Sequence, residues 1–200
     1  CRRKDLPALS QQGPATPDHV IRTKRLPMLG RDVQAYVQAY KAYFESQAPH
    51  ARTPIRRMLD PAPRVVLDPE LGMLAIGKST PEADIVADIY RHTIRIIQRA
   101  ARLGAWRALP AADIFDVEYW ELEQAKLRKG GTPPLFQGEV ALVTGAASGI
   151  GKACVESFLK RRAAVVALDR NPIIETLFDH PGVLGLLCDV TDPPHIRQAL

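Results

Sequence analysis

The stretch that decides the fold reads Val143-Thr144-Gly145-Ala146-Ala147-Ser148-Gly149-Ile150-Gly151. An apolar run, 139–144, leads into it, as is typical of a parallel strand that is covered on both faces. Three glycines then interrupt the run, and a helical apolar stripe follows at Ile150, Ala153, Cys154 and Phe158. This order predicts a strand, a sharp turn and a helix.

Such a turn points the N-terminus of the helix at a ligand, where free amides and the helix dipole favour a pyrophosphate. Glycine is needed where the backbone meets that ligand. A second apolar run, 163–168, ends at Asp169, which lies 18 residues (169 − 151) after Gly151, close to the spacing of ~20 in dinucleotide-binding domains. The sequence therefore predicts a dinucleotide site; the alternative is a glycine-rich turn that binds no ligand.

The acidic residue also predicts which dinucleotide is bound. Asp169 would accept hydrogen bonds from the adenosine ribose and would repel a ribose phosphate, so we expect NAD rather than NADP. Arg170 follows directly and weakens this preference. A third apolar run, 184–188, ends at Asp189. Together the three runs predict an α/β fold, namely the N-terminal half of a doubly wound parallel sheet with strand order 3-2-1 and right-handed crossovers.

Residues 138–200 resemble the start of a short-chain dehydrogenase/reductase, a Rossmann-type domain. The segment 144–151 is similar to the Thr-Gly-x-x-x-Gly-x-Gly motif of that family, and Cys188-Asp189-Val190-Thr191 resembles its acidic turn after the third strand. The resemblance implies that Ser148 and Ile150 lie along the pyrophosphate and that the acidic turn contacts adenine. The predicted cofactor-binding residues are Gly145, Ser148, Gly149, Ile150, Gly151, Asp169, Arg170, Asp189 and Val190.

Two departures from that family stand out. Arg162 occupies the position between helix and strand where these domains usually have glycine, at a cost of about 1 kcal/mol if its backbone is left-handed. The family's catalytic Ser and Tyr-x-x-x-Lys are absent, since none of the five tyrosines has a lysine four residues later. No catalytic residue is therefore assigned, and we expect this piece to bind NAD without catalysing hydride transfer.

The residues before the dehydrogenase-like segment predict a mixed α/β region. We expect a helix over 32–45, a hairpin from 64–67 and 73–76, and a weaker helix over 114–127. A further helix starts at Ser79 or Thr80 and ends at Gly104, with an apolar face formed by Ile85, Ile89, Ile96, Ala100 and Leu103. Lys129-Gly130-Gly131-Thr132-Pro133-Pro134 reads as a linker. The predicted organisation is a linker or trailing loop over 1–17, an aldolase-type region over 18–128, a linker over 129–137 and a truncated NAD-binding domain over 138–200.

Residues 14–200 also resemble bifunctional proteins that join a class II aldolase to a short-chain dehydrogenase. The matching segments include 14–29, 71–78, 87–94 and 115–123, in the same order and spacing. The resemblance implies cleavage of a sugar such as rhamnulose 1-phosphate, NAD-dependent oxidation of lactaldehyde or a related sugar, and a homo-oligomer. Class II aldolases hold a divalent metal, usually zinc, through His-x-His. No His-x-His occurs here, so no metal ligand is assigned; we expect the metal upstream and the chain to be a fragment.

Composition excludes other classes of function. The net charge is +5, and arginines and lysines gather at 22–31 and at Arg52, Arg56 and Arg57. Without interleaved aromatics these predict a solvated basic face rather than a nucleic-acid site, with a phosphate site as the alternative. His19 reads as an ordinary loop residue, or alternatively as part of a sugar-phosphate site or a subunit interface. There is no apolar run of the ~18 residues that cross a membrane, and three widely spaced cysteines suit the cytoplasm.

Two other functions are compatible with the residues. A plain dehydrogenase with an unrelated N-terminal extension would lack any upstream His-x-His. A non-catalytic NAD-binding module would keep the glycines and Asp169 but would have no Tyr-x-x-x-Lys anywhere in its reading frame.

Overall fold

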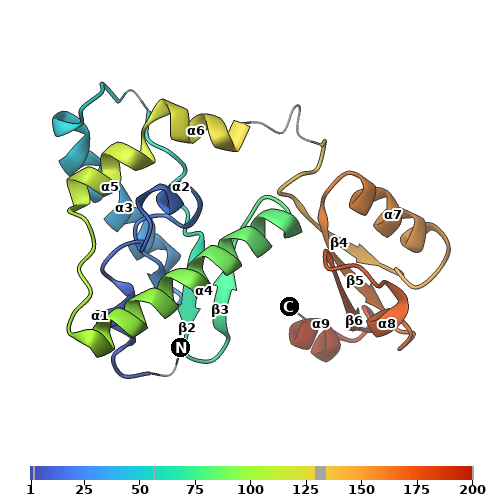
Figure 1. The fold of residues 1–200 in the computed structure, drawn as a ribbon. Coiled ribbons are helices and arrows are strands. Elements are labelled where there is room, and N and C mark those ends of the chain that lie inside the picture. Colours follow the sequence, from blue (N-terminus) through green and yellow to red (C-terminus); the bar gives the residue numbers. More distant parts are fainter. Residues whose placement is uncertain (2, 56, 129–133, 200) are drawn as a thin grey trace. The chain divides into compact units, whose positions relative to one another are not determined.

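The computed structural model describes residues 1, 3–55, 57–128 and 134–199. The chain forms two compact units, one of Cys1–Ile76 with Ala83–Gly131 and one of Gly77–Glu82 with Thr132–Leu200 (Figure 1). The predicted linker residues 129–133 lie outside the described residues, as does Arg56 of the second basic cluster.

The second unit contains the parallel sheet that the glycine turn predicts. Its elements are β4 (Val140–Thr144), α7 (Gly149–Lys160), β5 (Ala164–Asp169), α8 (Ile174–Leu177), β6 (Val183–Leu187) and α9 (Pro193–Ala199). The strand order is β4-β5-β6, with Val143 beside Ala167 and Ala167 beside Gly185. The α/β prediction and the strand order 3-2-1 are therefore confirmed.

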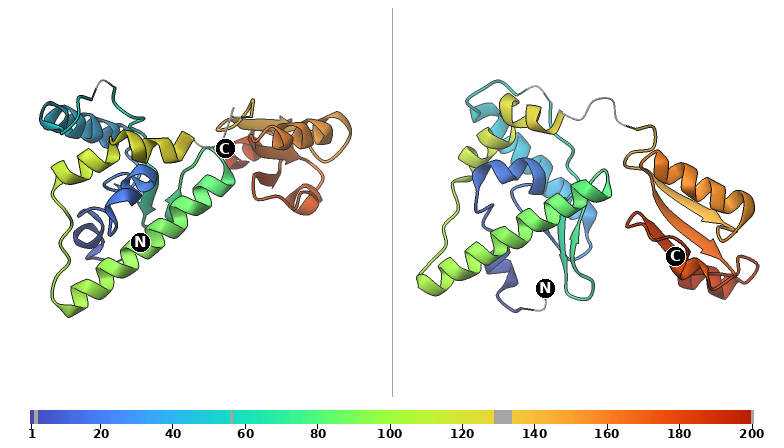
Figure 2. Two further views of the ribbon diagram at one scale, coloured as in Figure 1. Left: turned by 45° about the horizontal axis from the view of Figure 1, so that its top comes forward. Right: turned by 45° about the vertical axis from the view of Figure 1, so that its right-hand side comes forward.

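One face of this sheet carries the core of the unit. Val143, Val155, Val165, Ala167 and Ile174 are buried together, and they come from β4, β5, α7 and α8. Figure 2 shows α7 running beside this sheet. The chain turns from α7 into β5 at Arg162, whose φ of 67° is left-handed. The strained conformation at this non-glycine position is thus present.

The other face of the sheet is partly open. The side chains of Val140, Leu142 and Leu184 are 71%, 54% and 56% exposed. Leu142 and Leu184 both lie beside Val166 in the register of the sheet, so they point to the same face. The strands therefore carry apolar residues on both faces of the sheet, as a doubly wound sheet requires. The core of the second unit covers only one of these faces.

The first unit is a small mixed sheet surrounded by helices. Its elements are α1 (Leu6–Ser10), η1 (Pro17–His19), α2 (Val20–Thr23), β1 (Met28–Leu29), α3 (Val33–Gln47), η2 (Ala48–His50), β2 (Val65–Asp68), β3 (Gly72–Ala75), all but the first three residues of α4 (Thr80–Leu103), α5 (Ala111–Glu118) and α6 (Glu121–Arg128). β2 and β3 form the predicted antiparallel hairpin, and β1 adds to β2 in parallel. Val65 and Leu67 pack against Val86 and Tyr90 of α4. Figure 1 shows α4 beside β2 and β3.

Asp68 organises the hairpin turn. Its Oδ1 accepts hydrogen bonds from the amides of Glu70 and Leu71, both at 2.8 Å. Arg31 donates to both carboxylate oxygens, at 2.6 and 3.0 Å. These hydrogen bonds hold the pKa of Asp68 well below its usual range, with the Arg31 guanidinium the largest cause. The carboxylate therefore joins the hairpin to the segment that precedes α3.

The buried face of α4 differs from the predicted one. Val86, Ala87, Tyr90, Thr93 and Ile97 are buried, whereas Ile85 is 43% and Leu103 91% exposed. Both sets have helical spacing, because this helix carries apolar residues around more than half of its circumference. The sheet selects the face, and the spacing alone does not identify it.

Two other segments differ from their predictions. Residues 1–17, predicted as a linker or trailing loop, contain α1, in which Leu9 is buried; Pro7 sits in its first turn, where proline suits a helix. The predicted helix over 114–127 is two helices, since α5 ends before Tyr119 and α6 begins at Glu121.

Candidate functional site

The glycine turn connects β4 to α7 and depends on left-handed backbone. Gly145 has φ of 64° and Gly149 has φ of 51°. A Cβ atom added at either position would meet nothing within 4 Å. The backbone at these two glycines therefore faces open space into which a ligand could bring oxygen atoms close.

Gly151 is required for a different reason. A Cβ atom there would lie 2.1 Å from the carbonyl oxygen of Gly145 and 2.6 Å from its carbon. Only glycine lets the first turn of α7 pass so close to the end of β4. Gly151 thereby sets the direction in which α7 leaves the turn.

The N-terminus of α7 is open. Ser148 is the N-cap residue, with φ of −153° and ψ of 170°, and its side chain makes no capping hydrogen bond. The first amides of a helix have no partner within the helix, so those of Gly149, Ile150 and Gly151 are available to a ligand. Ser148 and Gly149 are exposed, and the Ile150 side chain is 86% exposed. This arrangement favours an anion in front of the helix.

Asp169 ends β5 and is hydrogen-bonded to the glycine turn. Its Oδ2 accepts from the amide of Ala147 at 2.9 Å, and its Oδ1 accepts from the amide of Asn171 at 2.8 Å. These two bonds lower the pKa of Asp169, and the charge of Arg170 contributes to the same effect. The carboxylate is therefore charged at neutral pH and stands directly beside the turn.

Asp189 and Val190 follow β6 at the same end of the sheet. The amide of Cys188 donates to the carbonyl of Asp169 at 2.8 Å, which joins the second acidic turn to the first. Thr191 donates to Asp189 Oδ1 through its hydroxyl at 2.7 Å and its amide at 2.9 Å, and these bonds lower the pKa of Asp189. Val190 is 48% exposed. The positive charge of Arg170 also lowers the pKa of Asp189. Arg170 therefore stabilises the carboxylate at both acidic turns.

All nine predicted cofactor-binding residues thus lie at the carboxyl ends of β4, β5 and β6, in the glycine turn with the first residues of α7 and at the two acidic turns. Sequence reasoning missed Ala147, which contributes its backbone amide; the amino-acid type at that position carries no signal of this. It also missed Gly185, where a Cβ atom would lie 2.1 Å from the carbonyl oxygen of Ile174 in α8. A glycine inside an apolar strand is a signal of such a close approach.

Two residues of the basic cluster at 22–31 form ion pairs within the first unit, and Lys24 is buried rather than solvated. Lys24 is buried, with its Nζ 2.9 Å from the Tyr40 hydroxyl and 3.1 Å from Glu118 Oε1. Arg31 is bound to Asp68 and Glu70. Lys24 and Arg31 are thus paired with carboxylates of other elements, whereas Arg22 and Arg25 form no ion pair among the described residues. Nδ1 of His19 is buried without a hydrogen-bond partner in the part of the chain that the structure describes.

Within 1, 3–55, 57–128 and 134–199, no group of three or more His, Cys, Asp or Glu side chains is placed to hold a metal ion. Across the same residues, every helix is too short or too polar to traverse a bilayer.

Two family models cover nearly all of the chain. The second domain of class II aldolases matches residues 1–127, and short chain dehydrogenase matches residues 139–200. The aldolase match begins at the first residue, so it includes the segment that the prolines suggest is a linker.

Curated relatives match the same two parts. The uncharacterized oxidoreductase YuxG of Bacillus subtilis is 33% identical over 182 residues, which are 82% of this chain and 26% of that protein. The 3-oxoacyl-(acyl-carrier-protein) reductase FabG of Salmonella typhimurium is 41% identical over 69 residues, 32% of this chain and 28% of the relative. The 15-hydroxyprostaglandin dehydrogenase (NAD+) of Rattus norvegicus is 40% identical over 69 residues, 30% of this chain and 26% of the relative.

The chain spans about a quarter of the length of these relatives. The match to YuxG is long enough to include both units. The matches to FabG and to the prostaglandin dehydrogenase cover 69 residues each, about the length of the short chain dehydrogenase match. The chain belongs to the family defined by the second domain of class II aldolases, here fused to a short-chain dehydrogenase segment.

Proposed function

We propose that this chain provides the NAD-binding half of an oxidoreductase that is fused to a class II aldolase. The observation that carries the proposal is the hydrogen bond from the Ala147 amide to Asp169, which places a charged carboxylate beside an open helix N-terminus. A pyrophosphate would occupy the amides of Gly149, Ile150 and Gly151, and the adenosine ribose would lie against Asp169.

The residues present fit a dinucleotide. Left-handed Gly145 and Gly149 face open space, and the capping position of α7 is not filled by Ser148. Asp189 and Val190 would lie beside the adenine, and Ser148 and Ile150 along the pyrophosphate. NAD, when bound, accepts or donates a hydride. This chain holds and orients the adenosine part, and catalytic groups are expected elsewhere in the parent protein.

The preference for NAD over NADP follows from charge. A ribose phosphate would be placed against the Asp169 carboxylate, whose pKa is already lowered by the Ala147 and Asn171 amides and by Arg170. Arg170 is exposed and could turn toward such a phosphate. The repulsion is therefore reduced but retained, since the carboxylate is fixed by two hydrogen bonds. The name of the rat relative, which specifies NAD+, supports the same choice.

For the whole protein we propose a sugar-derived small molecule as substrate, a divalent metal such as zinc in an aldolase part outside this chain, a homo-oligomeric assembly and a cytoplasmic location. The order of the two matched families supports a bifunctional enzyme, and YuxG is named an oxidoreductase. A metal-dependent aldol cleavage assay and an NAD reduction assay on the full reading frame would test these activities together.

The test of the binding site is a titration of the chain with NAD+ and NADP+, followed by calorimetry. We expect NAD+ to bind more tightly, and Asp169→Asn to weaken NAD+ at least tenfold while reducing the difference between the two cofactors. Asp179→Asn is the matched control, because Asp179 is an exposed carboxylate of the same unit. Equal affinities for NAD+ in the two variants would refute the proposed site. NAD+ binding without oxidoreductase activity in the full protein would favour the non-catalytic module.

A further inference from the structure

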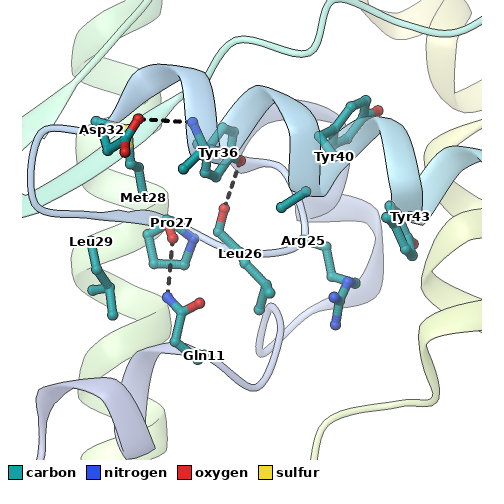
Figure 3. Close-up of a pocket in the computed structure, with 12 residues that line it drawn as sticks. Gln11, Arg25, Leu26, Pro27, Met28, Leu29, Asp32, Tyr36, Tyr40 and Tyr43 are labelled. Atoms are coloured by element: carbon teal, nitrogen blue, oxygen red, sulfur yellow. Dashed lines mark hydrogen bonds between the residues drawn. The ribbon is translucent and has the colours of Figure 1, made fainter.

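A cavity that is separate from the candidate dinucleotide site lies entirely within the first unit. It has a volume of about 300 Å³ and runs between residues 25–29 and one side of α3 (Figure 3). Its size is at the lower end of small-molecule sites, enough for one ring with a substituent. The cavity shares no residue with the three turns proposed for the dinucleotide.

The walls of this cavity are apolar or already satisfied. Leu26, Pro27 and Met28 form one side, and α3 contributes Tyr36, Tyr40 and Tyr43. Each tyrosine hydroxyl donates inside the protein: to the Leu26 carbonyl at 2.9 Å, to Glu118 at 2.8 Å and to the Ala111 carbonyl at 3.0 Å, respectively. The tyrosines therefore present ring surfaces to the cavity and no free donor.

Arg25 differs from these lining residues because its charge is not paired among the described residues. Its guanidinium stacks over the Tyr43 ring, with Cζ 4.8 Å from the ring centroid, and the side chain is half-buried. Over the described ranges it makes no ion pair with a carboxylate. Glu118, the carboxylate behind the tyrosines, is already paired with Lys24 at 3.1 Å. A stacked guanidinium is held flat, and its remaining donors suit a carboxylate or a phosphate.

Asp32 stands at the other end of α3 from Tyr43 and does not neutralise this cation. Its Oδ1 caps the helix by accepting from the Ala35 amide at 2.8 Å, and Figure 3 shows Asp32 beside Met28 while Arg25 lies toward Tyr43. Gln11 is also engaged, since its Nε2 donates to the Pro27 carbonyl at 3.0 Å. The cavity thus combines apolar walls with one unneutralised cation at one end.

We infer that this cavity binds a small organic anion, with its carboxylate or phosphate on Arg25 and an apolar ring against Tyr36 and Leu26. The inference is independent of the proposed dinucleotide site. Charge complementarity gives the anion its position, and the aromatic and aliphatic walls select a ligand with a flat or cyclic body over a bare ion. Both oxyanions fit the guanidinium, so the carboxylate or phosphate identity is left to the experiment.

The test uses three probes with one ring and different head groups: phenyl phosphate, phenylacetate and neutral benzyl alcohol. Each is titrated by calorimetry into the whole chain in the presence of NAD+, which occupies the other candidate anion site. We expect the better anion to bind at least tenfold more tightly than benzyl alcohol. The stronger of the two anions identifies the class of head group.

Three variants locate the site. Arg25→Met should weaken the anions at least tenfold and leave benzyl alcohol unchanged. Arg22→Met, a change of equal charge three residues away and outside the cavity, should alter nothing. Ala39→Trp should weaken all three probes, because Ala39 is an exposed cavity residue and the indole would fill the space without disturbing the core. Melting curves confirm folding. Unchanged anion affinity in Arg25→Met, or unchanged affinities in Ala39→Trp, would overturn the inference.

Discussion

At the scale of single residues, the three glycines of the phosphate turn act in different ways. Gly145 and Gly149 are needed for their left-handed backbone, while Gly151 is needed because two chain segments meet there. A motif written as three equal glycines hides this difference. The difference has consequences that can be measured on the stability of the chain.

Gly151→Ala is expected to be more damaging than Gly149→Ala. The first places a methyl group 2.1 Å from the Gly145 carbonyl oxygen, so the helix or the strand must move, at a cost of about 3 kcal/mol. The second meets open space and costs about 1 kcal/mol through its left-handed backbone. Urea unfolding of both variants measures the difference; a loss at Gly149 as large as that at Gly151 would contradict the close-contact explanation.

The residues of the candidate site were largely accessible from the sequence. Spacing and residue type predict that the glycines, Asp169 and Asp189 lie at one end of the sheet, because a carboxylate at the end of a parallel strand has a defined position relative to the preceding turn, and the structure has them there. The bond between Asp169 and Ala147 was not accessible, since it uses a backbone amide. The pairing of Lys24 with Glu118 was not accessible either, because 94 residues separate them.

At the scale of elements, the buried pair joins α2 to α5. Lys24 directly follows α2 with φ of 63°, and Glu118 is the last residue of α5. Nζ of Lys24 also lies 4.1 Å from the centre of the Tyr40 ring of α3. Burial lowers the pKa of Lys24, and the charge of Glu118 opposes that change. Three helices therefore depend on one internal cation.

Lys24→Met is expected to destabilise the first unit by about 3–5 kcal/mol, because it leaves a fully buried carboxylate without a cation. The double variant Lys24→Met with Glu118→Leu should recover most of that loss. Chemical unfolding measures both. Arg91→Met, which breaks an exposed pair with Asp88, is the control and should cost less than about 1 kcal/mol. A double variant as unstable as the single one would show that packing, not charge, is responsible.

The hairpin turn should make the first unit sensitive to acid. The pKa of Asp68 is depressed in the folded state, so its contribution to stability is present above the unfolded pKa of about 3.9 and is lost as pH falls through the lower folded value. Unfolding midpoints measured from pH 7 downward should therefore fall below about pH 4. Asp68→Asn should be less stable at neutral pH and should show a flatter acid limb. An acid limb of unchanged steepness in that variant would assign the sensitivity to other carboxylates.

Some helices and strands, and some of their boundaries, could not be predicted from the sequence. The parallel strands were predictable because apolar runs alternate with turn residues. β1 was missed, since two residues between Pro27 and Gly30 show no periodicity. α5 and α6 were read as one helix because neither glycine nor proline marks the break at Tyr119 and Trp120. α4 was predicted with correct ends, but the choice of its buried face requires the position of the sheet.

At the scale of the whole molecule, the two units differ in how completely they cover their sheets. In the second unit, Val140, Leu142 and Leu184 leave apolar surface on one face of the sheet. We therefore expect the chain to associate at high concentration and to bind hydrophobic dyes.

Leu142→Thr should reduce both effects. Threonine is β-branched, which suits a strand, and its hydroxyl and smaller size remove apolar surface from the open face. Light scattering and dye fluorescence on the whole chain provide the measurements. Leu71→Thr is the control, because Leu71 is a comparably exposed leucine in the hairpin turn of the first unit. Equal effects of the two substitutions would mean that the open face has no special role.

The hydrogen bond between Asp169 and the Ala147 amide has a consequence for redesign. A protein engineer who exchanges Asp169 for a small neutral residue, in order to admit NADP, would also release the backbone of the phosphate loop. The variant would accept the new cofactor into a looser loop and lose affinity for both. An asparagine, whose side-chain oxygen can still accept from the amide, together with a second cation beside Arg170, would separate the change of charge from the loss of rigidity.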